Sequence, residues 1–214
     1  MDTILSLKDV SISFGGVHAV NHVSFDIGRG ELVGLIGPNG SGKSTTVNLI
    51  SGVYRVDGGE IYFKGEKIPT NMDIVHRSRL GMGRTFQTPK PFGNLTVFDN
   101  VLSIALLKDG FREAVAKTND VLERTRLASV QDMLSSKLPI ERRKWLDLAR
   151  ILVTGADFIM LDEALAGLNS AEMDESLELV RQINDDGVTI LFIEHIMRAV
   201  VKLCNRVVVL NDGS

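Results

Sequence analysis

The sequence predicts an α/β fold built on a buried, largely parallel sheet, with a small antiparallel sheet before it and a helical insert. Residues 1–30 alternate apolar and polar side chains with a period of two, as half-buried strands do. From Glu31 onwards, short continuous apolar runs are joined by helical stretches, which is typical of strands buried on both faces. The 214 residues, 44% apolar and 24% charged, suit one globular domain, so we expect a single domain over 1–214.

The N-terminal segment accounts for the predicted antiparallel sheet. Gly15-Gly16 is a turn signal between two alternating stretches, which favours a hairpin. A further strand at 60–63 follows the turn Asp57-Gly58-Gly59. We therefore place an antiparallel β-subdomain at about 1–30 and 59–65. The alternating apolar residues are Ile4, Leu7, Val10, Ile12, Phe14, Val23, Phe25 and Ile27.

The central sheet and its helices follow from the later pattern. Continuous apolar runs predict core strands at 32–36, 158–161, 189–193 and 207–210. Stretches with helical spacing predict helices at 42–51, 142–153, 171–184 and 197–204. Between about 92 and 140 the helical spacing continues without a strand signal, so we expect an inserted helical subdomain there.

Composition narrows the classes of function. The 24 basic and 27 acidic residues leave a net charge of −3, which argues against a nucleic-acid binder that depends on a strong positive field. The single cysteine, Cys204, provides no disulfide framework, and we interpret it as a small buried apolar side chain. The start of the chain has no signal-peptide pattern and no run of 18 apolar residues occurs, so we expect a soluble or peripheral protein.

A phosphate-binding motif follows the first core strand. Residues 37–44 match G-x-x-x-x-G-K-[ST] between an apolar strand and a helix. Glycines let backbone N–H groups turn towards a polyphosphate, Lys43 is expected to reach the β- and γ-phosphates, and the Ser44 hydroxyl is expected to bind Mg²⁺. The alternative is a glycine-rich turn that caps a helix without a ligand. The predicted nucleotide-binding residues are Gly37, Pro38, Asn39, Gly40, Ser41, Gly42, Lys43, Ser44 and Thr45.

An acidic pair ends the second core strand. Asp162 and Glu163 follow the apolar run 158–161, about 120 residues after Lys43. At the end of a strand beside a phosphate loop, Asp162 can hold the Mg²⁺ shell and Glu163 can polarise an attacking water. The alternative is a solvated loop. A GTPase would need a base-reading segment of the N-K-x-D type, which the sequence lacks.

Taken in order along the whole chain, these motifs resemble those of ABC transporter ATP-binding subunits. The resemblance implies a P-loop NTPase (RecA-like) core with an antiparallel β-subdomain and an inserted helical subdomain. Phe14 would stack on adenine, where the alternative is a core strand residue. Gln87, in Arg84-Thr85-Phe86-Gln87, would act in catalysis and sense Mg²⁺, and His195 would contact the γ-phosphate. The alternative for Gln87 and His195 is a purely structural role.

Three segments, 14–21, 166–169 and 193–197, look most like those of branched-chain amino acid importers. The implied function is ATP hydrolysis that powers a membrane importer of branched-chain or related amino acids, with ATP and Mg²⁺ as cofactors. The implied partners are membrane-spanning subunits, a second ATPase subunit and, indirectly, a solute-binding protein, but no nucleic acid. The implied location is cytoplasmic, on the inner face of the cell membrane. The alternative is a soluble ATPase of iron–sulphur cluster assembly.

Two further segments bear on the partners that the resemblance implies. Lys90, Pro91, Phe92 and Leu95 are candidates for the surface that docks on the membrane-spanning subunits, with a plain packed loop as the alternative. In the segment 166–169, which corresponds to a loop that crosses the dimer interface, asparagine replaces the usual aspartate.

The chain departs from the family pattern next to the acidic pair and in the signature segment. Ala164 follows Glu163 where relatives usually have proline, which predicts a looser turn. The signature, usually L-S-G-G-Q, is Leu138-Pro139-Ile140-Glu141-Arg142 in this chain. Its distance from Asp162 in the sequence identifies the segment.

This altered signature predicts weak binding to the ATP of a partner. Pro139 lacks both the hydroxyl and the N–H that would bond the γ-phosphate. Glu141 is expected to bring a carboxylate towards that phosphate, while Arg142, Arg143 and Lys144 either offset its charge or lie on a solvated helix face. We therefore expect a hetero-pair with one strong and one weak site; the alternative partner is a second copy of this chain.

Overall fold

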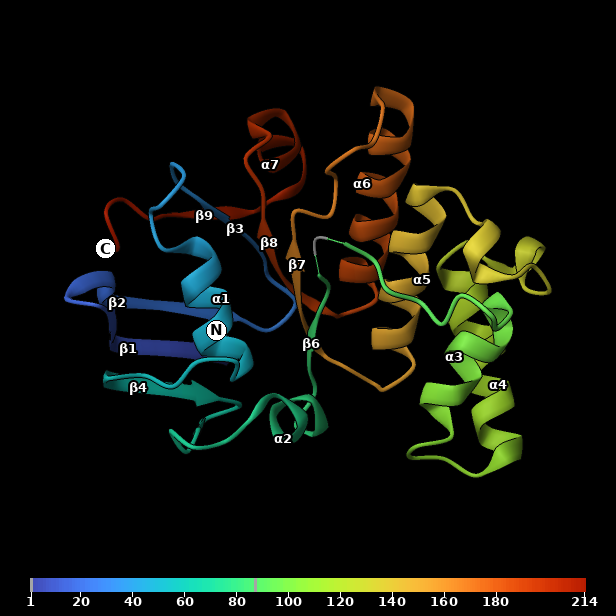
Figure 1. Ribbon diagram of the computed structural model, residues 1–214, viewed down its shortest axis with the longest axis horizontal. Coiled ribbons are helices and arrows are strands. Elements are labelled where there is room, and N and C mark those ends of the chain that lie inside the picture. Colours follow the sequence, from blue (N-terminus) through green and yellow to red (C-terminus); the bar gives the residue numbers. More distant parts are fainter. Residues whose placement is uncertain (1, 87) are drawn as a thin grey trace.

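The computed structural model describes residues 2–86 and 88–214 and contains two sheets (Figure 1). One is antiparallel, with the strand order β2-β1-β4-β5. The other is parallel, with the order β6-β7-β8-β3-β9. The strands are β1 (Thr3–Phe14), β2 (Val17–Gly28), β3 (Leu32–Ile36), β4 (Gly58–Phe63), β5 (Glu66–Lys67), β6 (Met82–Arg84), β7 (Phe158–Asp162), β8 (Thr189–Ile193) and β9 (Arg206–Val209).

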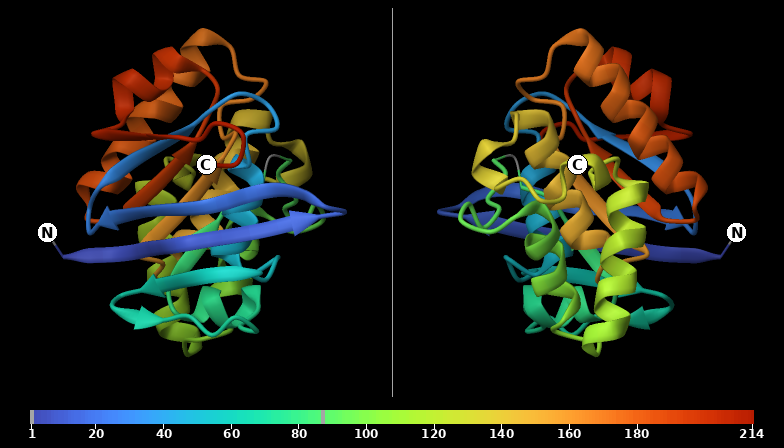
Figure 2. Two further views of the ribbon diagram at one scale, coloured as in Figure 1. Left: turned by 90° about the vertical axis from the view of Figure 1, so that its left-hand side faces the viewer. Right: turned by 90° about the vertical axis from the view of Figure 1, so that its right-hand side faces the viewer.

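Seven α-helices lie in the described residues, and they surround the parallel sheet. They are α1 (Lys43–Ser51), α2 (Ile74–Arg79), α3 (Val97–Ala105), α4 (Phe111–Arg124), α5 (Ile140–Leu152), α6 (Ser170–Asp185) and α7 (Met197–Leu203). The antiparallel strands lie at one side of the molecule and the hairpin of α3 and α4 at the opposite side (Figures 1 and 2). No helix among these is both long and apolar enough to cross a membrane.

The two faces of the parallel sheet belong to two hydrophobic clusters. On one face, side chains of β3, β7 and β8 pack with α1 and with the inner face of the antiparallel sheet. On the other face, they pack with α5, α6 and α7, and the same cluster continues into α3 and α4. Strands β7 and β8 are buried along their whole length, which explains their continuous apolar runs.

The predicted core elements agree with the structure within two residues at each end. The hairpin of β1 and β2 turns at Gly15-Gly16 as predicted. The expected turn at Asp57-Gly58-Gly59 is wrong in part, because both glycines belong to β4. Gly59 has φ +80 and lies so close to the backbone of Asp9 that a Cβ would come within 2.2 Å of its carbonyl oxygen. This position therefore bends the strand and requires glycine.

Cys204 lies against the parallel sheet. A Cβ at Gly34 would come within 3.1 Å of its Sγ, so the sulphur fills the space that the glycine leaves. Burial raises the pKa of the thiol to about 12. The side chain thus remains a neutral thiol at neutral pH, in agreement with the interpretation of Cys204 as a small apolar residue.

Candidate functional site

The phosphate loop connects β3 to α1, and two of its glycines are required by close backbone contacts. A Cβ at Gly37 would lie 2.1 Å from the carbonyl oxygen of Leu210. Gly42 has φ +92, and a Cβ there would lie 2.4 Å from the carbonyl oxygen of Ala19. A side chain at either position would collide with the neighbouring backbone. Only glycine therefore fits at these two positions of the loop.

Lys43, the first residue of α1, turns its ammonium group back onto the loop. Its Nζ donates to the carbonyl oxygens of Gly37 and Pro38, at 2.8 and 2.9 Å. Helix α1 has neither a side-chain cap nor an acidic residue in its first turn, whereas a side chain caps α2, α3 and α6. Its N-terminus therefore keeps the positive end of the helix dipole available for an anion.

The side chains around Lys43 fit a nucleotide with its Mg²⁺. Ser44 is exposed and Thr45 half-buried, and the buried Ser41 hydroxyl finds no hydrogen-bond partner among the described residues. Pro38, Asn39 and Gly40 form an exposed rim. A cation, an unpaired hydroxyl and an uncapped helix start suit a polyphosphate, and the Ser44 hydroxyl is an oxygen ligand of the type Mg²⁺ prefers.

Asp162 ends β7 and lies at the same edge of the sheet as the phosphate loop. Leu35 of β3 and Asp162 of β7 both pair with Ile193 of the intervening strand β8. At ordinary strand spacing their backbones are thus about 10 Å apart. The carboxyl ends of the parallel strands bring the loop and the acidic pair together, as the sequence predicts.

Arg84 holds the Asp162 carboxylate and connects it to the helix that follows the phosphate loop. Its Nη2 donates to Asp162 Oδ2 at 2.9 Å, and its Nη1 donates to Asn48 Oδ1 of α1 at 2.6 Å. Both members of the ion pair are largely buried, with side chains 10% and 12% exposed. The position of Arg84 in the sequence predicts neither of these contacts.

Glu163 and His195 follow neighbouring strands. The N–H of Glu163 donates to the carbonyl of Ile193 at 3.0 Å, two residues before His195. Glu163 has φ +48, a left-handed conformation that is uncommon for glutamate. The His195 side chain is 61% exposed, and its Nδ1 lies 3.9 Å from Glu194 Oε2. The two predicted catalytic residues therefore reach the same edge of the sheet.

One predicted residue, Phe14, stands apart from this edge. Phe14 ends β1 on the surface, where it is 45% exposed and contacts the ring of Tyr54 edge-on at 5.2 Å. Its alternative interpretation as a core residue is therefore wrong, and its ring is accessible. Gln87 lies outside the described residues.

The signature segment is placed differently from expectation. Pro139 is the N-cap of α5, and Ile140 is 42% exposed. Glu141 instead turns inwards, is 7% exposed, and leaves Oε1 without a partner in the described parts of the chain. Burial, followed by the charge of Glu175, raises the pKa of Glu141. The expectation that Glu141 points a carboxylate at phosphate is thus wrong, because the side chain packs towards α6.

The three basic residues after Glu141 bind backbone carbonyls rather than form a solvated face, and the charge of Arg142 also partly offsets that of Glu141. Arg142 and Arg143 donate to the carbonyls of Arg126 and Ser136, each at 2.6 Å. Lys144 donates to the carbonyls of Ala164 and Ala166. Each side chain therefore fastens α5 to a neighbouring loop.

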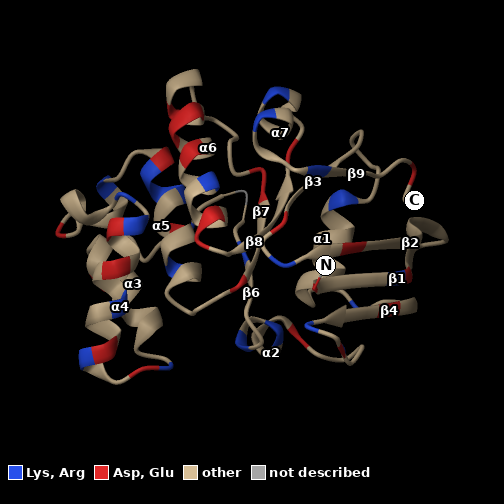
Figure 3. Cartoon of the chain, turned by 180° about the vertical axis from the view of Figure 1, so that it is seen from behind, with Lys and Arg blue, Asp and Glu red and all other residues tan. Residues whose placement is uncertain are grey.

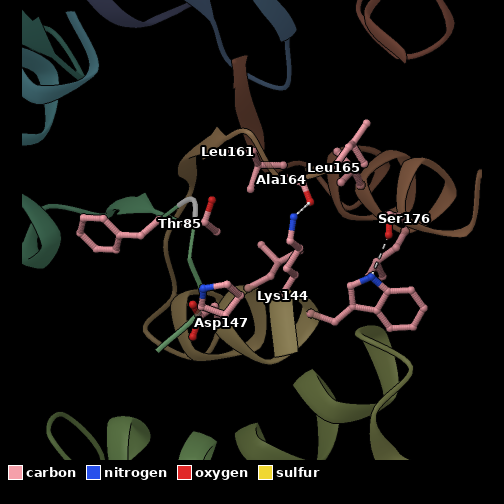
Figure 4. Close-up of a pocket in the computed structure, with 13 residues that line it drawn as sticks. Thr85, Lys144, Asp147, Leu161, Ala164, Leu165 and Ser176 are labelled. Atoms are coloured by element: carbon pink, nitrogen blue, oxygen red, sulfur yellow. Dashed lines mark hydrogen bonds between the residues drawn. The ribbon is translucent and has the colours of Figure 1, made fainter. Parts of the chain in front are cut away.

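A pocket between α5 and α6 opens beside these contacts (Figure 4). Leu161, Ala164 and Leu165 form its wall next to Glu163, while Trp145 Nε1 donates to Ser176 Oγ at 3.1 Å across its far side. No sequence pattern indicates the roles of Arg84, Lys144 and Glu194, because an isolated charged residue on a strand or helix is usually an ordinary surface residue.

Comparison with known proteins identifies the family. Residues 20–166 match the ABC transporter family model. The chain is 35% identical to the high-affinity branched-chain amino acid transport ATP-binding protein LivG of Escherichia coli, covering 99% of this chain and 89% of that protein. It is 28% identical to the lipopolysaccharide export system ATP-binding protein LptB of the same species, covering 98% and 87%.

Solved structures agree. The fold matches cbiO1 of Clostridium perfringens, part of the ABC transporter complex cbiONQ, with a TM-score of 0.93 and 27% identity over 100% of this chain and 86% of that one. It also matches the ADP conformation of an ATP-binding cassette of an ABC transporter, with a TM-score of 0.90 and 29% identity over 100% and 89%. The chain therefore belongs to the ABC transporter family, as an ATP-binding and ATP-hydrolysing subunit with ATP and Mg²⁺ as cofactors.

Proposed function

We propose that this chain powers an importer of branched-chain or related amino acids. The observation that carries the proposal is the likeness to LivG over nearly the whole chain, together with an intact phosphate loop and acidic pair at one edge of the sheet. The proposed partners are membrane-spanning subunits, a second ATPase subunit and, indirectly, a solute-binding protein. In this arrangement the chain lies in the cytoplasm, on the inner face of the cell membrane.

The residue roles belong to the same proposal. The phosphates of ATP bind the backbone of residues 37–45 and the Lys43 ammonium, and Phe14 stacks on adenine. Ser44, Asp162 and Gln87 hold Mg²⁺, which when bound offsets the negative charge of the phosphates. Glu163 polarises the attacking water and accepts its proton, while Gln87 and His195 align the water and the γ-phosphate.

The signature segment supports pairing with a related but different ATPase subunit. Pro139 and Ile140 are its exposed residues, and neither side chain can donate a hydrogen bond to phosphate. Because Glu141 is buried, the weakness comes from missing donors rather than from a repelling charge. We propose that the partner's own signature completes the ATP site on this chain, while the site on the partner is the weak one.

The docking surface for the membrane-spanning subunits is proposed at residues 90–95. Phe92 and Leu95 are 48% and 37% exposed, and the guanidinium of Arg150 lies 4.8 Å from the Phe92 ring centre. Exposed apolar side chains beside cations suit a surface that another protein covers. The transport roles in the names of LivG and LptB favour this proposal over iron–sulphur cluster assembly.

Charge also supports a protein partner over nucleic acid. Figure 3 shows Asp and Glu interspersed with Lys and Arg along α4 and α5, whereas α6 carries mainly Asp and Glu. Such mixed charge, with a net value of −3, does not provide the continuous basic stripe that a phosphate backbone would require.

Uptake tests this function directly. The full complex, reconstituted in vesicles with the solute-binding protein, should accumulate labelled leucine when ATP is supplied on the side of this chain. The matched control is the same complex with the Glu163→Gln variant of this chain, which should assemble but not take up leucine. Uptake that continues unchanged in that control, or copurification of this chain with iron–sulphur assembly proteins instead of membrane subunits, would contradict the proposal.

A further inference from the structure

The loop that follows Glu163 is held from two sides by charged side chains. Lys144 of α5 donates from Nζ to the carbonyl oxygen of Ala164 at 2.9 Å (Figure 4). It also donates to the carbonyl oxygen of Ala166 at 2.6 Å. From the end of β8, Glu194 Oε1 accepts the N–H of Leu165 at 2.8 Å. The backbone polar groups of three consecutive residues are thus bound by a cation and an acidic side chain that come from different elements.

The two side chains differ in their burial, since Glu194 is fully buried and Lys144 is half-buried. Glu194 is 1% exposed, and its Oε2 has no hydrogen-bond partner within residues 2–86 and 88–214. Burial lowers the pKa of Lys144, opposed by its attraction to Glu194 and Glu163, and burial raises the pKa of Glu194. Hydrogen bonds made by a charged donor or acceptor are short and strong, and a carboxyl side chain is almost never fully buried unless it is paired.

Glu163 needs this support because of its backbone. At φ +48 its conformation is one that a residue with a side chain adopts only when its surroundings over-determine it. The carbonyl of Glu163 accepts the N–H of Ala166 at 3.2 Å, so the turn that begins at Glu163 closes on a residue bound by Lys144. Ala164 has no ring to restrict this turn, and the side-chain contacts supply the restriction instead.

We infer that Lys144 and Glu194 are positioning residues that hold Glu163 in place for ATP hydrolysis by clamping the backbone of residues 164–166. The inference rests on the proposed catalytic role of Glu163. Lys144 lies one turn beyond Ile140 on α5, so the clamp also fixes this loop to the helix that begins with the signature segment. The position of Glu163 therefore follows that of α5.

Hydrogen–deuterium exchange of the full chain tests the clamp without relying on activity. Lys144→Met keeps the length of the side chain but removes its donors, whereas Lys144→Arg keeps donors for both carbonyls. We expect the amides of residues 163–168 to exchange about tenfold faster in Lys144→Met and at the wild-type rate in Lys144→Arg. The matched control is Lys117→Met on α4, where the lysine pairs with Asp109 and Glu113 far from this loop in sequence. It should leave this exchange unchanged.

Kinetics of the full chain test the link to Glu163. A small displacement of a catalytic group lowers turnover strongly, so we expect kcat of Lys144→Met to fall by about 10- to 100-fold with KM within about twofold of wild type. In a Glu163→Gln background, Lys144→Met should leave the affinity for a fluorescent ATP analogue unchanged. Glu194→Leu should resemble Lys144→Met, while Glu194→Gln, which keeps an acceptor for Leu165, should remain closer to wild type.

Wild-type exchange and wild-type kcat in Lys144→Met would overturn the inference, as would faster exchange without a loss of kcat. An equal loss in Lys144→Arg would also overturn it, since packing alone would then explain the effect. If Lys144→Met does not fold, as judged by circular dichroism, Lys144→Gln replaces it under the same criteria. Hydrolysis at the wild-type rate by Glu163→Gln alone would instead contradict the proposed function, so the two failures are distinguishable.

Discussion

At the scale of single residues, Arg84 shows how a buried charge organises the site. Its guanidinium binds Asp162 on β7 and Asn48 on α1. Its Cζ lies 5.2 Å from the centre of the Phe86 ring. The residue therefore joins the helix after the phosphate loop, the proposed metal ligand and the segment that leads to Gln87. A buried ion pair of this kind fixes geometry even where its net contribution to stability is small.

Replacement of Arg84 by methionine should reveal both roles. The change leaves the Asp162 carboxylate buried without its cation, which should lower the free energy of unfolding by about 3 to 5 kcal/mol. Urea unfolding measures that loss, and a Mg²⁺ titration of ATP binding should show a changed requirement for the metal. Arg84→Lys keeps the charge but cannot reach both partners, so an intermediate result is expected. Wild-type stability and metal dependence in Arg84→Met would refute this account.

The residues of the phosphate loop and the acidic pair could be predicted because a local motif specifies them. Gly37, Gly42 and Lys43 lie within one short segment of the chain, so their spacing alone indicates the shape of the phosphate loop. The inward orientation of Glu141 could not be predicted, since it depends on α6, which is distant in sequence. Lys144 and Glu194 also escaped prediction, because their partners are backbone groups on another loop.

At the scale of elements, Arg77 ties α2 to the end of α1. It is 3% exposed, and its Nη1 donates to the carbonyls of Leu49 and Ile50 in the last turn of α1, at 2.5 and 2.8 Å. Carbonyls in the last turn of a helix lack partners within it; the carbonyl of Leu49 also accepts the N–H of Gly52 at 3.3 Å. A cation at this end also complements the helix dipole. The helix that carries Lys43 at its start is thus anchored at its other end.

Arg77→Met should test this anchor. The substitution removes the guanidinium donors from the carbonyls of Leu49 and Ile50, so the free energy of unfolding should fall by about 2 to 4 kcal/mol. Urea denaturation followed by circular dichroism measures the change. Arg79→Met, on an exposed position of the same short helix, is the control and should alter stability little. Equal stability of the two variants would show that Arg77 does not anchor α1.

Elements with long, uniform patterns could be predicted, whereas short ones could not. The fully buried strands β7 and β8 have continuous apolar runs, so their sequences identify them. Strand β6 contains only Met82, Gly83 and Arg84, which have no strand pattern, and it exists because it pairs with β7. The two-residue strand β5 and the six-residue helix α2 were also missed, because so few residues show no periodicity.

At the scale of the whole molecule, the parallel sheet separates two layers with different tasks. The layer with α1 and the antiparallel sheet carries the phosphate loop and Phe14, whereas the layer with α3 to α6 carries the altered signature and the proposed docking surface. The acidic pair lies at the edge where both layers meet the sheet. This general division could be predicted from the order of motifs, but the contacts between the layers could not.

The proposed hetero-pair predicts the association state of the chain. In the Glu163→Gln background, ATP should leave the isolated chain mostly monomeric, because Pro139 and Ile140 offer the nucleotide no side-chain donor. Pro139→Ser with Ile140→Gly restores a hydroxyl and close backbone approach at the exposed positions, so it should increase the ATP-dependent dimer. Sedimentation velocity measures both. A stable dimer before the change, or no gain after it, would contradict the weak-signature proposal.

ATP binding and hydrolysis measured side by side in Glu163→Gln test the central claim most directly. The substitution keeps the shape of the side chain but removes the base. Affinity for Mg²⁺-ATP should stay within about threefold of wild type, while phosphate release falls by about 10²-fold or more. Lys43→Ala serves as the control, because loss of its ammonium should weaken binding itself. Hydrolysis by Glu163→Gln at the wild-type rate would contradict the assignment of Glu163 as the catalytic carboxylate.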